Sequence, residues 1–398
     1  MNTSSKTPQR HCMVVHNYYP LGEPRVQRQA EALVAAGIEV DVICLRNRDE
    51  APRAVAAGVN VYRVPVARDK NRGPVAQFFE YLAFFILAFA RVSLLHLLRR
   101  YDVVQVHNLP DFLVFAAAVP RLLGAAVILD LHDLMPEFYM SRFRRGPEAL
   151  PVRLILWQER VSCRFATHVI TVSSLWRQDL IRRGVPAAKC SVVMNLPDDR
   201  IFKADVTPAP RPEGFHLFYH GNLTHRYGVD LALRALAEVR ADIPDVFMTI
   251  HGRGEFLQTL QELCRQLDLE DIVRFSTGLL PMEALPALIA SADVAVVPYR
   301  RDVFTDGILP TKLMEYAALG IPTIVARTPV IEAYFDEDMV AYFDAEDIGQ
   351  LAGHIRSLYR DPERRRVLAG NIRRFTATYH WAKQKAEYVA LVRRLAAT

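Results

Sequence analysis

Cysteine is scarce in this 398-residue chain, and its spacing does not indicate disulfide or metal chemistry. The five cysteines are odd in number, lie far apart and include no C-x-x-C pair: Cys12, Cys44, Cys163, Cys190 and Cys264. This usage disfavours a disulfide framework or a zinc site and favours a reducing compartment. The first eleven residues are polar and lack the apolar stretch of a signal peptide, so we expect a cytoplasmic protein.

Two motifs of other enzyme classes are also missing. No G-x-G-x-x-G follows the first apolar strand, where His16–Gly22 holds a single glycine, which disfavours an NAD-dependent Rossmann oxidoreductase. No D-x-D pair stands at the end of a strand where it could hold a metal, and Asp198 and Asp199 are adjacent in a loop. We therefore predict no metal ligands.

Length and composition predict a globular protein of two domains. Apolar strands alternate with helices in two successive cycles along the chain. Such alternation is typical of doubly wound α/β folds. Thr207–Pro212, with three prolines, separates the two cycles as a predicted linker. The predicted strands of the first cycle are 12–16, 39–44, 60–64, 103–107, 126–131, 168–172 and 191–194; those of the second are 216–220, 246–252, 272–276, 294–297 and 322–326. We expect domains at residues 1–200 and 201–375, and a final helix at 376–398 that packs back on the first domain.

Charge is distributed unevenly between the two halves. Residues 1–195 hold 25 Lys and Arg but 16 Asp and Glu, whereas residues 196–398 hold 24 and 28. A basic first half indicates an anionic neighbour, such as phospholipid head groups, a lipid diphosphate or nucleic acid. Solvated surface arginines are the alternative explanation.

The segment Phe78–Leu98 is the longest apolar stretch of the chain. Residues 81–90 carry no charge, but Arg91 near the middle opposes a membrane-spanning helix. Two interpretations remain: a core helix of the first domain, or a helix with one face in a membrane, assisted by Arg99 and Arg100.

The most informative segment is Thr305–Pro322. Pro310 suits the first turn of a helix and Gly320 suits its end. Lys312 and Glu315 are three residues apart and share a helical face. This face offers a cation near a helix N-terminus, where a diphosphate is favoured, and a carboxylate able to accept hydrogen bonds from a ribose. An exposed Lys–Glu pair without such a role is the alternative.

The segment resembles the donor-binding signature of retaining GT-B glycosyltransferases of the family-4 type. In that family, two acidic residues eight apart precede A-x-x-G-x-P, and Glu315 matches the second, which holds the donor ribose. Gly307 stands in place of the first acid. We expect Asp306, or the backbone of Gly307, Ile308 and Leu309, to substitute for it.

The resemblance covers nearly the whole chain. It includes the glycine loop at Pro20–Gly22, the opening helix from Arg25, the strand Tyr101–Asn108, the D-x-H-D-x-x-P-E segment Asp130–Glu137, Tyr219–Gly221, His251–Gly254, Ala292–Pro298 and Trp381. It implies a GT-B architecture of two Rossmann-like doubly wound domains facing across a cleft. The first domain would bind the acceptor and the second the nucleotide sugar.

The resemblance also implies individual roles. His132 would face the transferred sugar, and Asp133 and Glu137 are candidates for acceptor contact or for capping the next turn. Asn222 and Tyr227 stand where the family commonly has Arg and Lys, so we assign Arg226 and Lys312 to the phosphates, with His225 as a weaker third. The predicted catalytic set is His132, Arg226, Lys312 and Glu315; the donor set adds Gly22, Gly221, Asn222, Gly252, Leu279, Asp306, Gly307, Ile308, Leu309 and Leu313, with Leu279 against the base.

We therefore expect a retaining, metal-independent glycosyltransferase without a cofactor. It would move a sugar from a UDP- or GDP-linked donor to a saccharide or lipid-linked acceptor, in cell-surface polysaccharide or glycoconjugate biosynthesis. We expect no nucleic-acid partner, and peripheral contact with the cytoplasmic face of the membrane. The alternatives are a sugar-nucleotide 2-epimerase and a non-catalytic GT-B partner subunit with a degenerate donor site.

Overall fold

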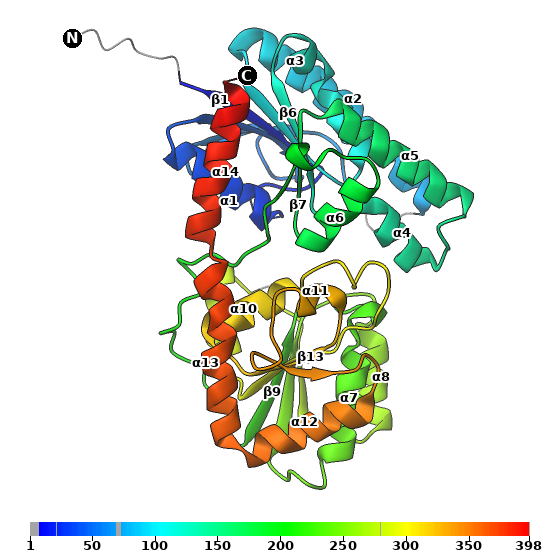
Figure 1. Cartoon of the computed structure of the whole chain (residues 1–398), viewed down its shortest axis with the longest axis vertical. Coiled ribbons are helices and arrows are strands. Elements are labelled where there is room, and N and C mark those ends of the chain that lie inside the picture. The colour runs from blue at the N-terminus through cyan, green and yellow to red at the C-terminus, as the bar shows by residue number, and fades with distance from the viewer. Residues whose placement is uncertain (1–7, 21, 69–72, 279, 398) are drawn as a thin grey trace, which may run out of the picture. The chain divides into compact units, whose positions relative to one another are not determined.

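The computed structural model describes residues 8–20, 22–68, 73–278 and 280–397 (Figure 1). The chain divides into two compact units. The first unit contains the residues up to Asn195 together with those from Lys383 on, and the second contains Leu196–Ala382. These boundaries lie a few residues from those expected at 200 and 375.

The first unit is built on an eight-stranded sheet with the order β3-β4-β2-β1-β5-β6-β7-β8. The strands are β1 (Arg10–Val14), β2 (Glu39–Leu45), β3 (Arg53–Ala56), β4 (Val59–Val64), β5 (Val103–His107), β6 (Ala126–Leu131), β7 (His168–Thr171) and β8 (Cys190–Val192). All pairs are parallel except β3 with β4. The order reverses between β1 and β5, and ligands of open α/β sheets bind at the carboxyl ends of strands beside such a reversal.

Helices of the first unit connect these strands, and the last helix returns to it from the end of the chain. They are α1 (Pro24–Ala35), α2 (Pro74–Arg99), η1 (Asp111–Ala117), α3 (Ala118–Leu122), α4 (Met135–Phe143), α5 (Leu150–Phe165), α6 (Ser174–Arg182), η2 (Ala187–Lys189) and α14 (Trp381–Ala396). Gln384 of α14 hydrogen-bonds to the backbone N–H and carbonyl of Met194. The Tyr388 hydroxyl donates to Oε1 of Gln105 over 2.6 Å, which ties α14 to the centre of the sheet.

Helix α2 is only partly a core helix, so the first of our two interpretations is wrong for one of its faces. Phe84, Ala88 and Val92 are buried, but Phe79 is 61% exposed and Leu97 is 64% exposed. Among the described residues, α2 is the one helix long and apolar enough to cross a membrane by length and composition. Sequence periodicity could not reveal the exposed face, because both faces of the helix are apolar.

The second unit contains a six-stranded parallel sheet in the order β11-β10-β9-β12-β13-β14. The strands are β9 (Phe215–His220), β10 (Val246–His251), β11 (Val273–Ser276), β12 (Val294–Val297), β13 (Thr323–Ala326) and β14 (Ala341–Phe343). In chain order this is 3-2-1-4-5-6, the order of dinucleotide-binding Rossmann folds. The reversal lies between β9 and β12, whose residues are all buried, as apolar runs covered on both faces predict.

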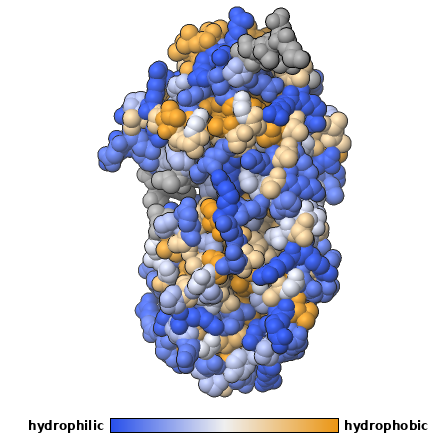
Figure 2. Space-filling view, turned by 90° about the vertical axis from the view of Figure 1, so that its left-hand side faces the viewer, coloured by the Kyte–Doolittle hydropathy of each residue, from blue (hydrophilic) through white to orange (hydrophobic). Residues whose placement is uncertain are grey.

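The helices of the second unit are η3 (His225–Tyr227), α7 (Val229–Val239), α8 (Leu257–Gln266), η4 (Met282–Ala284), α9 (Leu285–Ala290), α10 (Thr311–Leu319), α11 (Pro329–Glu332), α12 (Ile348–Arg360) and α13 (Pro362–Thr378). The predicted linker Thr207–Pro212 belongs to this unit, and the Ala209 N–H donates to the Ala287 carbonyl over 2.8 Å. Hydrophilic side chains dominate the surface that Figure 2 shows, with smaller hydrophobic areas between them.

Candidate functional site

Two glycines at the strand ends of the second unit allow the backbone to approach other groups closely. Gly221 follows β9 with φ +123°, and a Cβ there would lie 3.0 Å from Cε of Lys312. Gly252 follows β10, and a Cβ there would lie 2.0 Å from the Gly221 carbonyl oxygen. The structure thus brings together three predicted donor-site residues at the point where the strand order reverses, and only glycine fits at two of them.

Lys312, in the first turn of α10, is buried rather than exposed. Its Nζ donates to the Tyr299 hydroxyl over 3.0 Å. The ring centroids of Tyr219, Tyr227 and Tyr299 lie 4.8, 4.9 and 4.8 Å from Nζ. Burial lowers the pKa of Lys312 to about 7, although Glu315 opposes this shift. The sequence did not indicate these three tyrosines as a group.

Glu315, one turn further along α10, is paired with the last residue of β9. Oε2 of Glu315 lies 2.6 Å from Nε2 of His220, and Nδ1 of His220 lies 3.0 Å from the Tyr316 hydroxyl. The Glu315 side chain is 18% exposed, so the carboxylate still reaches solvent beside the Gly221 turn. His220 and Tyr316 are members of this site that sequence reasoning missed, although His220 directly precedes the predicted Gly221.

The predicted phosphate-binding cation Arg226 lies in η3, directly after the Gly221 turn. Its guanidinium carbon is 5.2 Å from the centroid of the Phe304 ring. Its carbonyl accepts a hydrogen bond from the Arg300 N–H over 3.0 Å. Asn222 and His225 are exposed.

The loop before α10 holds the residues expected to replace the missing first acid. Asp306 accepts hydrogen bonds of 3.0 and 2.9 Å from the guanidinium of Arg301. The N–H groups of Gly307 and Ile308 both donate to the Phe304 carbonyl. The Asp306 carboxylate and these two N–H groups are thus engaged within the loop. The remaining predicted members are Leu309, which is buried, Leu313, which is fully buried, and Leu279, which lies outside the described residues.

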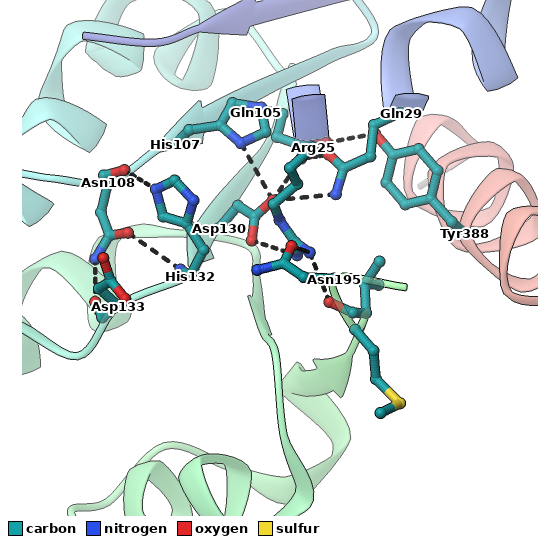
Figure 3. Close-up of polar contacts among 12 residues, drawn as sticks. Arg25, Gln29, Gln105, His107, Asn108, Asp130, His132, Asp133, Asn195 and Tyr388 are labelled. Atoms are coloured by element: carbon teal, nitrogen blue, oxygen red, sulfur yellow. Dashed lines mark hydrogen bonds and ion pairs between the residues drawn. The ribbon is translucent and has the colours of Figure 1, made fainter. Parts of the chain in front are cut away.

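His132 follows β6 in the first unit, at the carboxyl edge of the sheet, and Asn108 after β5 orients it (Figure 3). The His132 N–H donates to Oδ1 of Asn108 over 3.1 Å, and Nε2 of His132 lies against the Asn108 carbonyl oxygen. Because a carbonyl only accepts, the imidazole donates from Nε2. Burial lowers the pKa of His132, but Glu23, Asp133 and Asp130 outweigh burial, so the net shift is upward.

Beside His132 lies a buried hydrogen-bond network centred on Asp130 (Figure 3). The guanidinium of Arg25 donates to both carboxylate oxygens over 3.0 and 2.8 Å. Gln29 and Gln105 each donate to Oδ2 over 3.2 Å, and His107 lies 3.2 Å from the same oxygen. Burial would raise the pKa of Asp130, but Arg25 and His107 lower it well below the ordinary value. Arg25 lies in the first turn of α1, shortly after Gly22, whose N–H donates to the Tyr18 carbonyl over 3.1 Å.

The two acidic candidates for acceptor contact have different surroundings. The Asp133 carbonyl accepts a hydrogen bond from Nδ2 of Asn108. Glu137 is buried and paired with Arg183, which also donates to both oxygens of Glu159. Burial raises the pKa of Glu159 to about 7, and Arg183 opposes the shift. Within the described part of the chain, no group of three or more His, Cys, Asp or Glu side chains is placed to hold a metal.

The two units together define a GT-B glycosyltransferase fold: two Rossmann-like parallel sheets, with glycine turns and a Lys–Glu helix face at a strand reversal of the second. Family models match almost the whole chain, as "Glycosyl transferase 4-like domain" over residues 22–195 and "Glycosyl transferases group 1" over residues 204–375. The chain belongs to the group 1 glycosyltransferases, which confirms the resemblance found in the sequence.

Individual relatives agree with this classification. The chain is 32% identical over 180 residues to the GDP-mannose-dependent alpha-(1-6)-phosphatidylinositol monomannoside mannosyltransferase of Mycolicibacterium smegmatis, covering 44% of each chain. The chain spans about half the length of the curated relatives it matches. Sucrose-phosphate synthase from Thermosynechococcus elongatus superimposes with a TM-score of 0.79 at 19% identity, over 98% of this chain and 99% of the other. Anabaena HepE in complex with UDP gives a TM-score of 0.70 at 15% identity, over 97% and 100%.

Proposed function

We propose that this protein transfers a sugar from a nucleoside diphosphate sugar to a saccharide or lipid-linked acceptor. The observation that carries the proposal is the assembly of the Gly221 turn, Lys312 and Glu315 at the strand reversal of the second unit. The mycobacterial relative, a GDP-mannose-dependent mannosyltransferase named for phosphatidylinositol monomannoside, supports this chemistry. The structure of HepE with UDP supports a nucleotide site in this fold.

In the proposed mechanism, Glu315 accepts hydrogen bonds from the donor ribose, since its carboxylate is partly exposed beside the Gly221 turn. Arg226 and Lys312 provide positive charge for the departing diphosphate, because charge that develops in a transition state must be stabilised. His132 contributes a hydrogen bond or its carbonyl at the reacting carbon. The anomeric configuration is retained and no metal takes part.

The first experiment is a thermal-shift panel of UDP, GDP and ADP and their common sugar conjugates on the wild type. A ligand at 100 times its Kd adds about 2.7 kcal/mol of stability, which gives a measurable rise in Tm. We expect one nucleotide to raise Tm in the wild type and in the matched control Glu262→Ala, an exposed position on α8. Glu315→Ala should abolish the shift. A shift that survives in Glu315→Ala would contradict the assigned role of this carboxylate.

Two further measurements test the finer parts of the mechanism. NMR of the product should show the same anomeric configuration as the donor, and an inverted product would overturn the retaining mechanism. Turnover should persist after dialysis against EDTA, whereas loss of activity that Mg²⁺ restores would show a metal requirement.

We propose that the acceptor lies in, or attached to, the cytoplasmic face of a membrane, and that α2 and α5 of the first unit contact the lipid. On α5, Leu150, Leu154 and Trp157 follow the helical repeat and are 67%, 56% and 64% exposed. Helix α2 also exposes large apolar side chains, and both α2 and α5 pack on η1. Large apolar side chains that gather on the surface of a soluble protein commonly mark a contact with a membrane or a protein partner.

The charges around this surface favour an anionic bilayer as that partner. Arg142 in the last turn of α4 and Arg144 and Arg145 directly after it are exposed, as are Arg153 and Arg160 of α5. Basic residues beside an apolar helix face bind anionic lipid surfaces. Arg99, which the sequence suggested for this role, is paired instead with Glu39 and Asp41.

Co-sedimentation with vesicles tests the membrane contact. We expect binding to vesicles that contain phosphatidylglycerol and much weaker binding to pure phosphatidylcholine. Trp157→Ser with Leu154→Ser should reduce binding strongly, and so should Arg142→Glu with Arg144→Glu, whereas Val367→Ser, which changes an exposed valine of α13, should leave it unchanged. Equal partitioning of all variants would contradict the contact.

The comparisons do not favour the alternative of a partner subunit without catalysis, although Asn222 and Tyr227 stand where the family commonly has Arg and Lys. A nucleotide-induced shift in Tm without turnover of any donor would support that alternative.

A further inference from the structure

Lys312 is unusual among charged residues because its side chain is buried. The second unit contains two lysines, of which Lys203 is exposed and Lys312 is 5% exposed. Buried charges in proteins are normally paired with an opposite charge. The hydrogen-bond acceptor of Nζ, however, is a neutral hydroxyl, that of Tyr299.

Three tyrosines from three different segments surround the amine. Tyr219 comes from β9, Tyr227 from η3, and Tyr299 follows β12. Tyr227 and Tyr299 are stacked, with ring centroids 4.6 Å apart and planes inclined by 24°. Ring faces attract a cation weakly, so the cage accepts an ammonium group without neutralising it. We call these three residues the tyrosine cage.

The cage lies directly beneath the backbone turn formed by Gly221 and Asn222. A Cβ at Gly221 would lie 3.2 Å from Nζ of Lys312, so no side chain separates the amine from the turn. The Tyr219 hydroxyl donates to the Asn222 carbonyl over 2.9 Å. The lysine and its cage therefore contact both residues of the turn.

The electrostatics around the amine leave its charge incompletely compensated. The ionisable group that acts on the amine is Glu315 on the same helix, and Glu315 is bonded to His220 of β9. Burial raises the pKa values of Tyr219 and Tyr299, so both stay neutral. Burial also lowers the pKa of Lys312 to about 7, since Glu315 offsets only part of the desolvation.

We propose that Lys312 is a positioning residue that supports the Gly221–Asn222 turn from beneath and gains its full charge only when a diphosphate binds above the turn. This inference rests on the proposed function, because it assumes that the donor diphosphate binds at this turn. The charge acts through the backbone and not by direct contact. An anion nearby favours the protonated amine, so binding draws one proton from solvent to Nζ.

The test is calorimetric titration of the wild type with UDP and with GDP near pH 8, in two buffers that differ in ionisation enthalpy. The dependence of the binding enthalpy on buffer gives the number of protons taken up. For the nucleotide that binds, we expect uptake of most of one proton by the wild type and by the control Lys203→Met. Lys312→Met, which keeps the length and removes the charge, should show no uptake and about tenfold or more weaker binding.

Two other variants test whether Lys312 acts by supporting the turn or by contacting the diphosphate directly. Lys312→Arg keeps the charge but exceeds the space under Gly221, so we expect it to bind as weakly as Lys312→Met. Wild-type affinity in Lys312→Arg would overturn the buried position of the charge. Tyr299→Phe keeps the ring and loses the acceptor, and should bind a few times more weakly with proton uptake retained.

The remaining outcomes are also decisive. Unchanged affinity and uptake in Lys312→Met would overturn the role of Lys312 while leaving the donor site intact. Uptake that persists in a weakened Lys312→Met would assign the proton to another group and contradict the proposal. No binding of either nucleotide to the folded wild type would overturn the proposed function itself, and this inference with it.

Discussion

Asp130 in the first unit and Lys312 in the second are both buried ionisable groups near a strand reversal. The groups around Asp130 compensate its charge, whereas those around Lys312 do so only in part. Asp130 receives hydrogen bonds from Arg25, Gln29 and Gln105. Lys312 has one hydroxyl and three ring faces. The pKa values of both groups are lowered. For the carboxyl group of Asp130 this means that the charged form is stabilised, whereas for the amine of Lys312 it means that the charged form is destabilised.

The difference indicates two kinds of buried polar site. The Asp130 network has its charge compensated within the protein and joins β6, α1 and, through Gln105, α14. Such a site needs no ligand to be stable. The tyrosine cage does not fully compensate the positive charge of Lys312, and a bound anion would do so. We therefore expect the first site to contribute to stability and the second to reduce it.

The largest effect should come from breaking the Asp130 network. Asp130→Asn leaves the Arg25 guanidinium buried beside a neutral group, which costs about 3–5 kcal/mol in the free energy of unfolding. Urea denaturation measures this loss. The double variant Arg25→Met with Asp130→Leu should recover part of it, because no unpaired charge remains. A loss below about 1 kcal/mol in the single variant would contradict the comparison.

Lys312→Met should have the opposite sign and stabilise the ligand-free protein by ~4 kcal/mol near pH 7. Between pH 7 and the ordinary lysine pKa of about 10.4, the unfolded chain binds a proton that the folded amine does not. The stability of the wild type therefore rises with pH through this window, and the advantage of the variant shrinks. Thermal unfolding at pH 7, 8 and 9 measures this, and a constant difference would show that Lys312 does not titrate there.

A smaller effect concerns Glu159, whose pKa is raised to about 7 by burial. Between the ordinary value of about 4.3 and pH 7, the folded state binds more protons than the unfolded chain, so stability falls as pH rises. Glu159→Gln should remove about 2.5 kcal/mol of this decline between pH 5 and 8. Asp111, shifted in the same direction, leaves a residual slope. An unchanged pH profile in Glu159→Gln would assign the decline to other groups.

The smallest change in stability should follow Asp306→Asn. The Arg301–Asp306 pair is 55% and 29% exposed, and such pairs contribute about 0–1 kcal/mol. A loss of kcat/KM for the donor without a change in Tm would show that Asp306 acts on the sugar. Unchanged kinetics would assign the function of the missing acid to the backbone of the loop.

The sequence predicted the fold well where the signal was local. Buried parallel strands are apolar throughout, so β5, β6 and β12 were predicted with the bounds that the structure shows. The short strands β3 and β14 were missed, because three or four residues carry little periodicity and β3 pairs antiparallel in a hairpin.

By itself, the sequence determined the family and the two doubly wound sheets, and it predicted Gly221, Lys312 and Glu315 as members of one donor site. These features depend on residue order and on spacing along single elements. Only the tertiary structure decided that Lys312 is buried under the turn and that His220 pairs with Glu315. It also decided that one face of α2 is exposed. Burial, and with it every shift in pKa, depends on which distant segments pack together, and no local pattern of residue types encodes that packing.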